Sequence, residues 1–154
     1  YRLERFHKFK DSINMSFNDI SWSLTNVWFV TKTETAIQRV EENVRIVSLT
    51  NPIKNDITWD GNAFNTTEAR TFTYTNFGET INGYSNSVKV IQSDVENLIQ
   101  KTKYEQDFSK NIGITRFYYI DVESQNISNP NLPITERIEK GVQYEQILID
   151  YHVQ

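Results

Sequence analysis

A strict alternation of side-chain types over residues 70–76 constrains the fold more than any other feature of this sequence. Phe72 and Tyr74 fall on one side of an extended chain, and threonines occupy the positions on the other side. A period of two residues is typical of a strand that buries one face and exposes the other. The segment therefore predicts a sheet with an apolar face that other elements must cover.

Further segments have the β-branched and aromatic composition of strands. They cover residues 27–32, 44–49, 112–122 and 144–153. Asn51-Pro52 ends the second of them, because proline cannot donate a hydrogen bond to a ladder. Between the first two, Thr33–Asn43 is predicted to be either a hairpin tip or a short helix.

Two segments have the three- and four-residue spacing of apolar side chains that predicts an amphipathic helix. One covers about residues 1–20, and the other covers residues 87–101, where Val88, Ile91 and Val95 begin an apolar stripe. Together with the strands, these helices predict a single α+β domain over residues 1–154. We expect one antiparallel or mixed sheet of about five strands, with two main helices packed on it and a sheet-and-helix core over about residues 26–154.

The amino-acid composition argues against several kinds of catalytic and metal-binding site. The 154 residues include no cysteine, so thiolate metal sites and cysteine nucleophiles are excluded, and with two histidines a multi-histidine centre is not expected. We expect no catalytic residue, no metal, no cofactor and no enzymatic activity. A net charge of −4 argues against a surface that grips DNA phosphates, and no apolar run is long enough to span a membrane.

The carboxylates leave one catalytic alternative open. Asp56, Asp60, Glu68 and Glu79 lie in or near a long polar loop over residues 50–68. Two such groups facing each other across a cleft could serve a small glycosidase. Solvated surface acids are the more common explanation of this pattern.

Aromatic side chains in polar loops are the candidates for an interface, because a monomer has little reason to expose them. These residues are Trp59, Phe64, Phe77 and Tyr84. Packing of the same side chains onto their own core is an equally good interpretation.

The order of the expected elements resembles the tail-terminator or neck-terminator proteins of tailed bacteriophages. The likeness rests on the strand at 70–78, the helix at 87–101, the strand at 112–122 and the segment 132–151. In the last segment, Tyr144, Leu148, Ile149 and Tyr151 approximate the family's closing strand.

This resemblance implies a structural virion protein, assembled in the host cytoplasm, that forms a homo-oligomeric ring, commonly a hexamer. Such a ring caps the tail tube and joins it to the head connector, while DNA passes through the lumen without specific binding. The alternative is a monomeric carbohydrate- or ligand-binding module on an aromatic-rich β face, which the tryptophans, the tyrosines and the threonine-lined strand at 70–76 favour.

Overall fold

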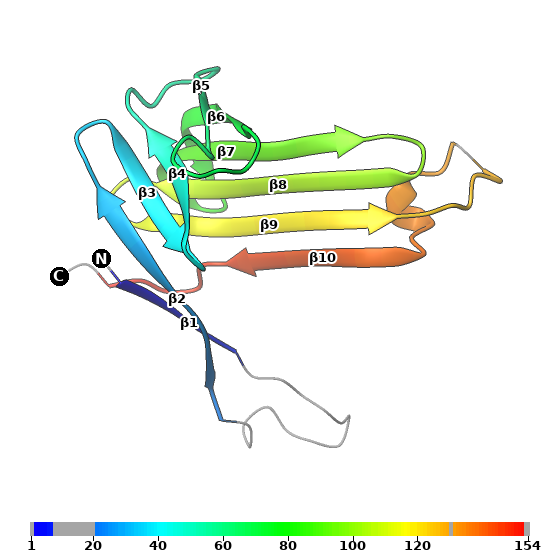
Figure 1. The fold of residues 1–154 in the computed structure, drawn as a ribbon, viewed down its shortest axis with the longest axis horizontal. Helices are drawn as coiled ribbons and strands as arrows, with labels where there is room; N and C mark the ends of the chain where they lie inside the picture. Colours follow the sequence, from blue (N-terminus) through cyan, green and yellow to red (C-terminus); the bar gives the residue numbers. More distant parts are fainter. Residues whose placement is uncertain (1, 8–20, 130, 153–154) are drawn as a thin grey trace. The chain divides into compact units, whose positions relative to one another are not determined.

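The computed structural model describes residues 2–7, 21–129 and 131–152, and almost all of their regular structure is β-sheet (Figure 1). In chain order the strands are β1 (Arg2–His7), β2 (Ser23–Lys32), β3 (Ala36–Glu41), β4 (Val44–Thr50), β5 (Thr58–Asp60), β6 (Thr71–Ile81), β7 (Tyr84–Glu96), β8 (Gln100–Ser109), β9 (Gly113–Glu123) and β10 (Lys140–Ile147). A single 3-10 turn, η2 (Ile134–Glu136), separates β9 from β10 in the described chain.

The strands form two compact units, each with an antiparallel sheet. The first unit comprises the described part of residues 1–51 together with residues 62–68. The second comprises residues 52–61 and the described part of residues 69–154.

The first unit is a four-stranded meander in the order β1-β2-β3-β4. Glu42 and Asn43 connect β3 to β4 with φ angles of 46° and 67°. Two positive φ angles make the tight hairpin turn whose twist matches that of the flanking strands. Trp28 and Leu49 are buried in this unit.

The second unit is a six-stranded sheet in the order β10-β9-β8-β7-β6-β5, so each strand pairs with its neighbour in sequence. Asn82-Gly83 forms the two-residue turn between β6 and β7, with φ angles of 51° and 86°. On one face of β9, Ile120 and Val122 are buried with Ile134 of η2. This 3-10 turn therefore covers one face of β9.

The prediction of an α+β fold with two main helices is wrong. The described residues contain no helix of seven or more residues, and they form two sheets. The strands predicted at 27–32, 44–49, 70–76 and 112–122 are confirmed as β2, β4, β6 and β9. Residues 33–43 form the β2–β3 turn, β3 and the turn into β4, so the short-helix alternative for this segment is also wrong.

The helix predicted over 87–101 is instead β7, a turn and the start of β8. The apolar positions fit both periods, because Val88, Ile91 and Val95 have helical spacing while Val88 and Val90 lie two residues apart, as on one face of a strand. Val90 is completely buried, whereas Val95 is 56% exposed. β-branched residues lose side-chain freedom in a helix and pack well on a pleated sheet, so pairing with β6 and β8 decides the conformation.

Two other boundaries differ from the sequence prediction. Arg2–His7 is a strand that pairs with β2, where the first helix was expected, and residues 8–20 of that prediction lie outside the described residues. The closing strand, expected at 144–153, covers Lys140–Ile147. Within the long polar loop, Thr58–Asp60 forms a short strand against β6.

Candidate functional site

A row of aromatic side chains crosses the second unit on one face of β8, β9 and β10. The ring of Tyr104 lies 5.1 Å from that of Phe117 and 5.4 Å from that of Tyr119, centroid to centroid. Phe117 in turn lies 6.0 Å from Tyr144 on the edge strand. All four side chains are partly exposed. These four residues form the aromatic row.

Alternation along β9 explains why the row faces outward. Phe117, Tyr119 and Asp121 point to one side of the sheet, while Ile120 and Val122 point to the other and are buried with Ile134. The strand therefore places its aliphatic residues in the core and leaves its aromatic residues on the side away from that cluster.

Charged and polar groups are fixed beside the aromatic row. The guanidinium of Arg70 lies 5.0 Å from the ring centroid of Tyr104. The carboxylate of Asp121 accepts hydrogen bonds from the Thr102 hydroxyl at 3.1 Å and from the Tyr119 hydroxyl at 3.2 Å. Burial, the charge of Asp121 and this hydrogen bond raise the pKa of Tyr119, which therefore stays protonated.

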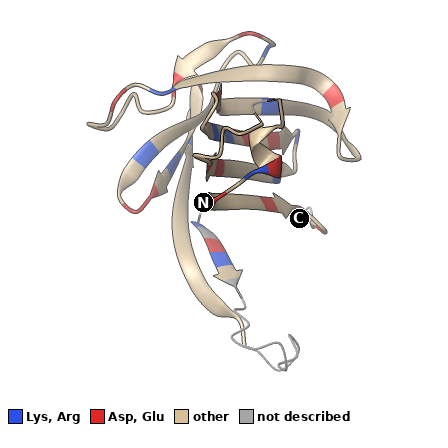
Figure 2. Cartoon of the chain, turned by 90° about the vertical axis from the view of Figure 1, so that its right-hand side faces the viewer, with Lys and Arg blue, Asp and Glu red and all other residues tan. Residues whose placement is uncertain are grey.

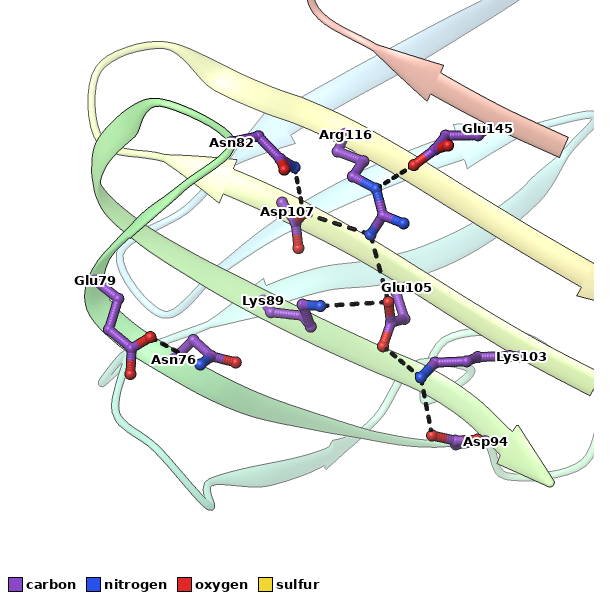
Figure 3. A network of polar contacts seen from close by, with 10 residues as sticks. All are labelled: Asn76, Glu79, Asn82, Lys89, Asp94, Lys103, Glu105, Asp107, Arg116 and Glu145. Carbon is purple, nitrogen blue, oxygen red and sulfur yellow. Dashed lines mark hydrogen bonds and ion pairs between the residues drawn. The ribbon is translucent and has the colours of Figure 1, made fainter. Parts of the chain in front are cut away.

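The opposite face of the same sheet carries a network of ion pairs (Figure 3). The Glu105 carboxylate on β8 lies 3.1 Å from Nζ of Lys103 and 3.4 Å from Nζ of Lys89. Arg116 on β9 lies 3.4 Å from Glu105, 3.7 Å from Asp107 and 2.6 Å from Glu145. These contacts connect β7, β8, β9 and β10.

The two central carboxylates of the network have pKa values shifted in opposite directions. Burial opposes ionisation of Glu105, but the hydrogen bond and charge of Lys103, with Lys89, outweigh it and lower the pKa of Glu105. Burial raises the pKa of Asp107; the charges of Lys89 and Arg116 counteract this rise only in part, and Glu105 adds to it.

Carboxylates with divergent pKa values also occur in hydrolytic active sites, but this pair lacks access to a substrate. Asp107 has no exposed surface, and Glu105 is 5% exposed. Asn82, at the β6–β7 turn, donates a hydrogen bond to Asp107 (Figure 3). The arrangement is that of a network that holds four strands together.

The four interface candidates lie in different environments. Trp59 on β5 is half-buried, and its ring lies 4.3 Å from that of Tyr74. Tyr84 donates a hydrogen bond to the carbonyl of Leu148. Phe64 and Phe77 are 57% and 50% exposed. Trp59 and Tyr84 thus pack against their own unit, and the interface role of all four stays a prediction.

The loop carboxylates considered for catalysis have structural partners. Asp60 accepts a hydrogen bond from the backbone N–H of Arg70 at 2.8 Å, and Glu79 accepts one from Asn76 at 2.8 Å. In the described part of the chain, no three acidic or histidine side chains gather where they could hold a metal ion. Nor do residues 2–7, 21–129 and 131–152 contain a helix with the length and apolarity that crossing a membrane requires.

Basic and acidic positions are interspersed along the strands (Figure 2). In the first unit, a pocket of about 340 Å³ lies beside Trp28. The guanidinium groups of Arg5 and Arg39 lie 4.7 and 4.6 Å from the Trp28 ring centroid. Arg5, Glu41 and Glu42 line this pocket, so it too carries both signs of charge.

The aromatic row as a whole is not predictable from a local sequence pattern, because its members come from three strands. Tyr104 follows the segment that was predicted to be helical, and no strand was expected there. The signal was the alternation of Thr102, Tyr104 and Phe108 along β8, which matches that of Phe117 and Tyr119 on β9.

Comparisons with family models, with curated proteins and with solved structures found no match to this chain.

Proposed function

We propose that this protein is a non-catalytic binding module that holds a carbohydrate on the aromatic row of β8, β9 and β10. The observation that carries the proposal is the combination of four partly exposed aromatic rings with a fixed carboxylate, Asp121, on one sheet face. The proposed function is the binding-module alternative that the sequence left open, but the site lies on β8, β9 and β10 and not on the strand at 70–76.

The chemistry of the row suits a sugar. A pyranose ring has apolar C–H faces, which pack on aromatic rings, and hydroxyl groups, which need hydrogen-bond acceptors. Asp121 is an acceptor held in place by Thr102 and Tyr119. The planes of neighbouring rings are nearly perpendicular, at 73° to 85°. The row is therefore not one flat surface, which favours a single soluble chain over the flat face of a polysaccharide crystal.

A glycan array followed by calorimetric titration of the best ligands tests the proposal. Tyr144→Ala and Phe117→Ala are each expected to weaken binding about tenfold or more, because each removes one stacking surface. Phe77→Ala is the matched control, since Phe77 is a similarly exposed aromatic residue of the same unit outside the row. An array without any bound glycan, or equal loss of affinity in the control, would overturn the proposal.

A second candidate is the ring-forming tail or neck terminator, a structural virion component. Its supporting observation is the exposure of Phe64 and Phe77, two of the expected contact residues. The strand-to-helix order on which the resemblance rested is not found, because Tyr84–Glu96 is a strand. Native mass spectrometry tests this candidate: a closed ring of about six subunits that Phe64→Ala or Phe77→Ala disrupts would favour it over the binding module.

A further inference from the structure

We propose that the outer edge of β10 pairs with β10 of a second copy of this chain, giving an antiparallel two-fold dimer with Gln143 on its axis. This inference concerns a different surface from the carbohydrate site and does not depend on the proposed function.

The outer edge of β10 has the features of a strand edge that can accept another strand. β10 is the last strand of the six-stranded sheet, and no described strand pairs with its outer side. All eight of its residues are exposed, and their register with β9 is unbroken from Lys140 to Ile147. By contrast, β5 at the other end of the sheet has only three residues.

Proteins that stay monomeric usually protect such an edge. The common devices are a proline, a bulge, a very short strand or an inward-pointing charge. β10 contains no proline and no register shift, and its two charged residues, Lys140 at its first position and Glu145, are each paired with a residue of β9. Val142 and Ile147 are 49% and 50% exposed on this strand, and Tyr144 is 39% exposed. An edge of this kind is a template for strand pairing.

The residues of β10 are compatible with those of a second β10 in the proposed register. Directly opposite residues of an antiparallel pair lie on the same face. With Gln143 on the axis, Val142 lies opposite Tyr144 of the second copy, and this pair occurs twice. Aromatic and β-branched side chains form favourable cross-strand pairs.

Charge also restricts the register. With Gln143 on the axis, Lys140 faces Gln146 and Gly141 faces Glu145, so no like charges are opposite each other. An axis at Glu145 would place two carboxylates face to face, and an axis at Val142 would oppose Glu139 and Glu145. Like charges directly opposite each other destabilise a ladder.

The dimer would join the two aromatic rows end to end. Tyr144 is the outermost member of the row, and its strand is the edge that pairs. A continuous aromatic face across two copies would then form.

Sedimentation equilibrium and native mass spectrometry of the full chain over a concentration series test the proposal. The unmodified chain is expected to form dimers. Gln143→Lys and Gln143→Glu should each weaken dimerisation at least tenfold, because each places like charges opposite each other on the axis. An equimolar mixture of the two variants should form a heterodimer, since a lysine then faces a glutamate.

Two controls separate this effect from misfolding and from net charge. Gln143→Ser should keep the dimer, and Gln125→Lys, at an exposed position beyond β9, should also keep it. A wild-type chain that stays monomeric, or charge variants that dimerise as well as wild type, would overturn the proposal. Tighter association of Gln143→Lys would overturn it too, because an axis at Tyr144 would place that lysine opposite Glu145. Since Gln143 and Tyr144 point to opposite faces, glycan binding by the monomeric variants is measured independently.

Discussion

Gly61 lies directly against the ring of Phe72, so closely that a Cβ atom at residue 61 would overlap three atoms of that ring. Phe72 is 1% exposed, and the Trp59 ring packs against it edge-to-face at 5.7 Å. The ring is therefore buried between Gly61 and Trp59, and a Cβ at residue 61 would have to displace it.

Gly61→Ala is expected to lower the free energy of unfolding by about 1–3 kcal/mol, as overpacking of a filled core does. Urea denaturation followed by circular dichroism measures the change. Gly78→Ala is a useful comparison, because Gly78 has open space around its Cα and a φ of 82°. It tests backbone strain without a clash. If Gly61→Ala lowered the free energy of unfolding no more than Gly78→Ala does, overpacking against Phe72 would not be the cause.

Gly141 is required for a different pair of reasons. Its φ of 126° is a conformation that other residues rarely adopt, and a Cβ there would come within 2.6 Å of the Val122 Cα. Gly141→Ala should therefore destabilise the β9–β10 pair by about 2 kcal/mol or more. Hydrogen exchange is the sharpest measurement, since amide protection should fall first along β10. Unchanged protection of β10 in this variant would refute the prediction.

Glu105 should stabilise the fold in a pH-dependent way. Its pKa is lowered in the folded state, so its contribution is present above the usual value of 4.5 and is lost as the pH falls through the lowered pKa. Glu105→Gln is expected to cost about 2–3 kcal/mol at pH 7, because it leaves three cations without their shared partner. Denaturation at pH 7, 5 and 3 should show that the gap in free energy of unfolding between wild type and variant becomes smaller in acid. A gap that is constant across this range would rule out the charge network as its cause.

Asp107 should show the opposite pH dependence. Its pKa is raised in the folded state, so its ionisation costs stability as the pH rises from 3.8 through the raised value. Asp107→Asn keeps an acceptor for Asn82 and removes this cost. The free energy of unfolding of the variant, relative to that of wild type, is therefore expected to be lowest below pH 3.8. It should rise by about 1 kcal/mol between there and neutral pH. The same denaturation series tests it, and a relative stability that falls with rising pH would contradict it.

Gln106 is a completely buried side chain whose amide nitrogen and oxygen both lack a hydrogen-bond partner among the described residues. Burying an unpaired amide costs free energy, so a side chain of similar size without polar hydrogen-bonding groups should be better tolerated. Gln106→Met is expected to raise the free energy of unfolding by about 1–2 kcal/mol, measured by thermal and urea unfolding. Gln146→Met, at an exposed position, should leave stability nearly unchanged. A less stable Gln106→Met variant would show that the amide is hydrogen-bonded in solution.

The strands with strong local signals could be read from the sequence. Alternation of Phe72 and Tyr74 with threonines predicted β6, and the apolar runs at 27–32 and 44–49 predicted β2 and β4. In these segments the side-chain pattern and the final environment agree, so local propensity was sufficient.

Residues 87–101 show where such reasoning fails. Val88, Ile91 and Val95 fit a helical stripe, yet Val88 and Val90 also fit a strand, and the period alone could not choose between the two. Asn97 Oδ1 accepts hydrogen bonds from the backbone N–H groups of Ile99 and Gln100 and so stabilises the turn between β7 and β8. The strands that pair with β7 are its sequence neighbours β6 and β8, most of whose residues lie outside 87–101, so the pattern within that segment does not include their contribution.

The sequence by itself determined that this chain has no cysteine and two histidines, so none of its own residues can act as a thiolate nucleophile or thiolate ligand. It also determined which side of each well-patterned strand is apolar. Only the tertiary structure decided that Tyr104, Phe117, Tyr119 and Tyr144 share one face, and that Glu105 collects three cations on the other. The physical reason is that neighbours across strands are set by register, and register depends on the whole sheet.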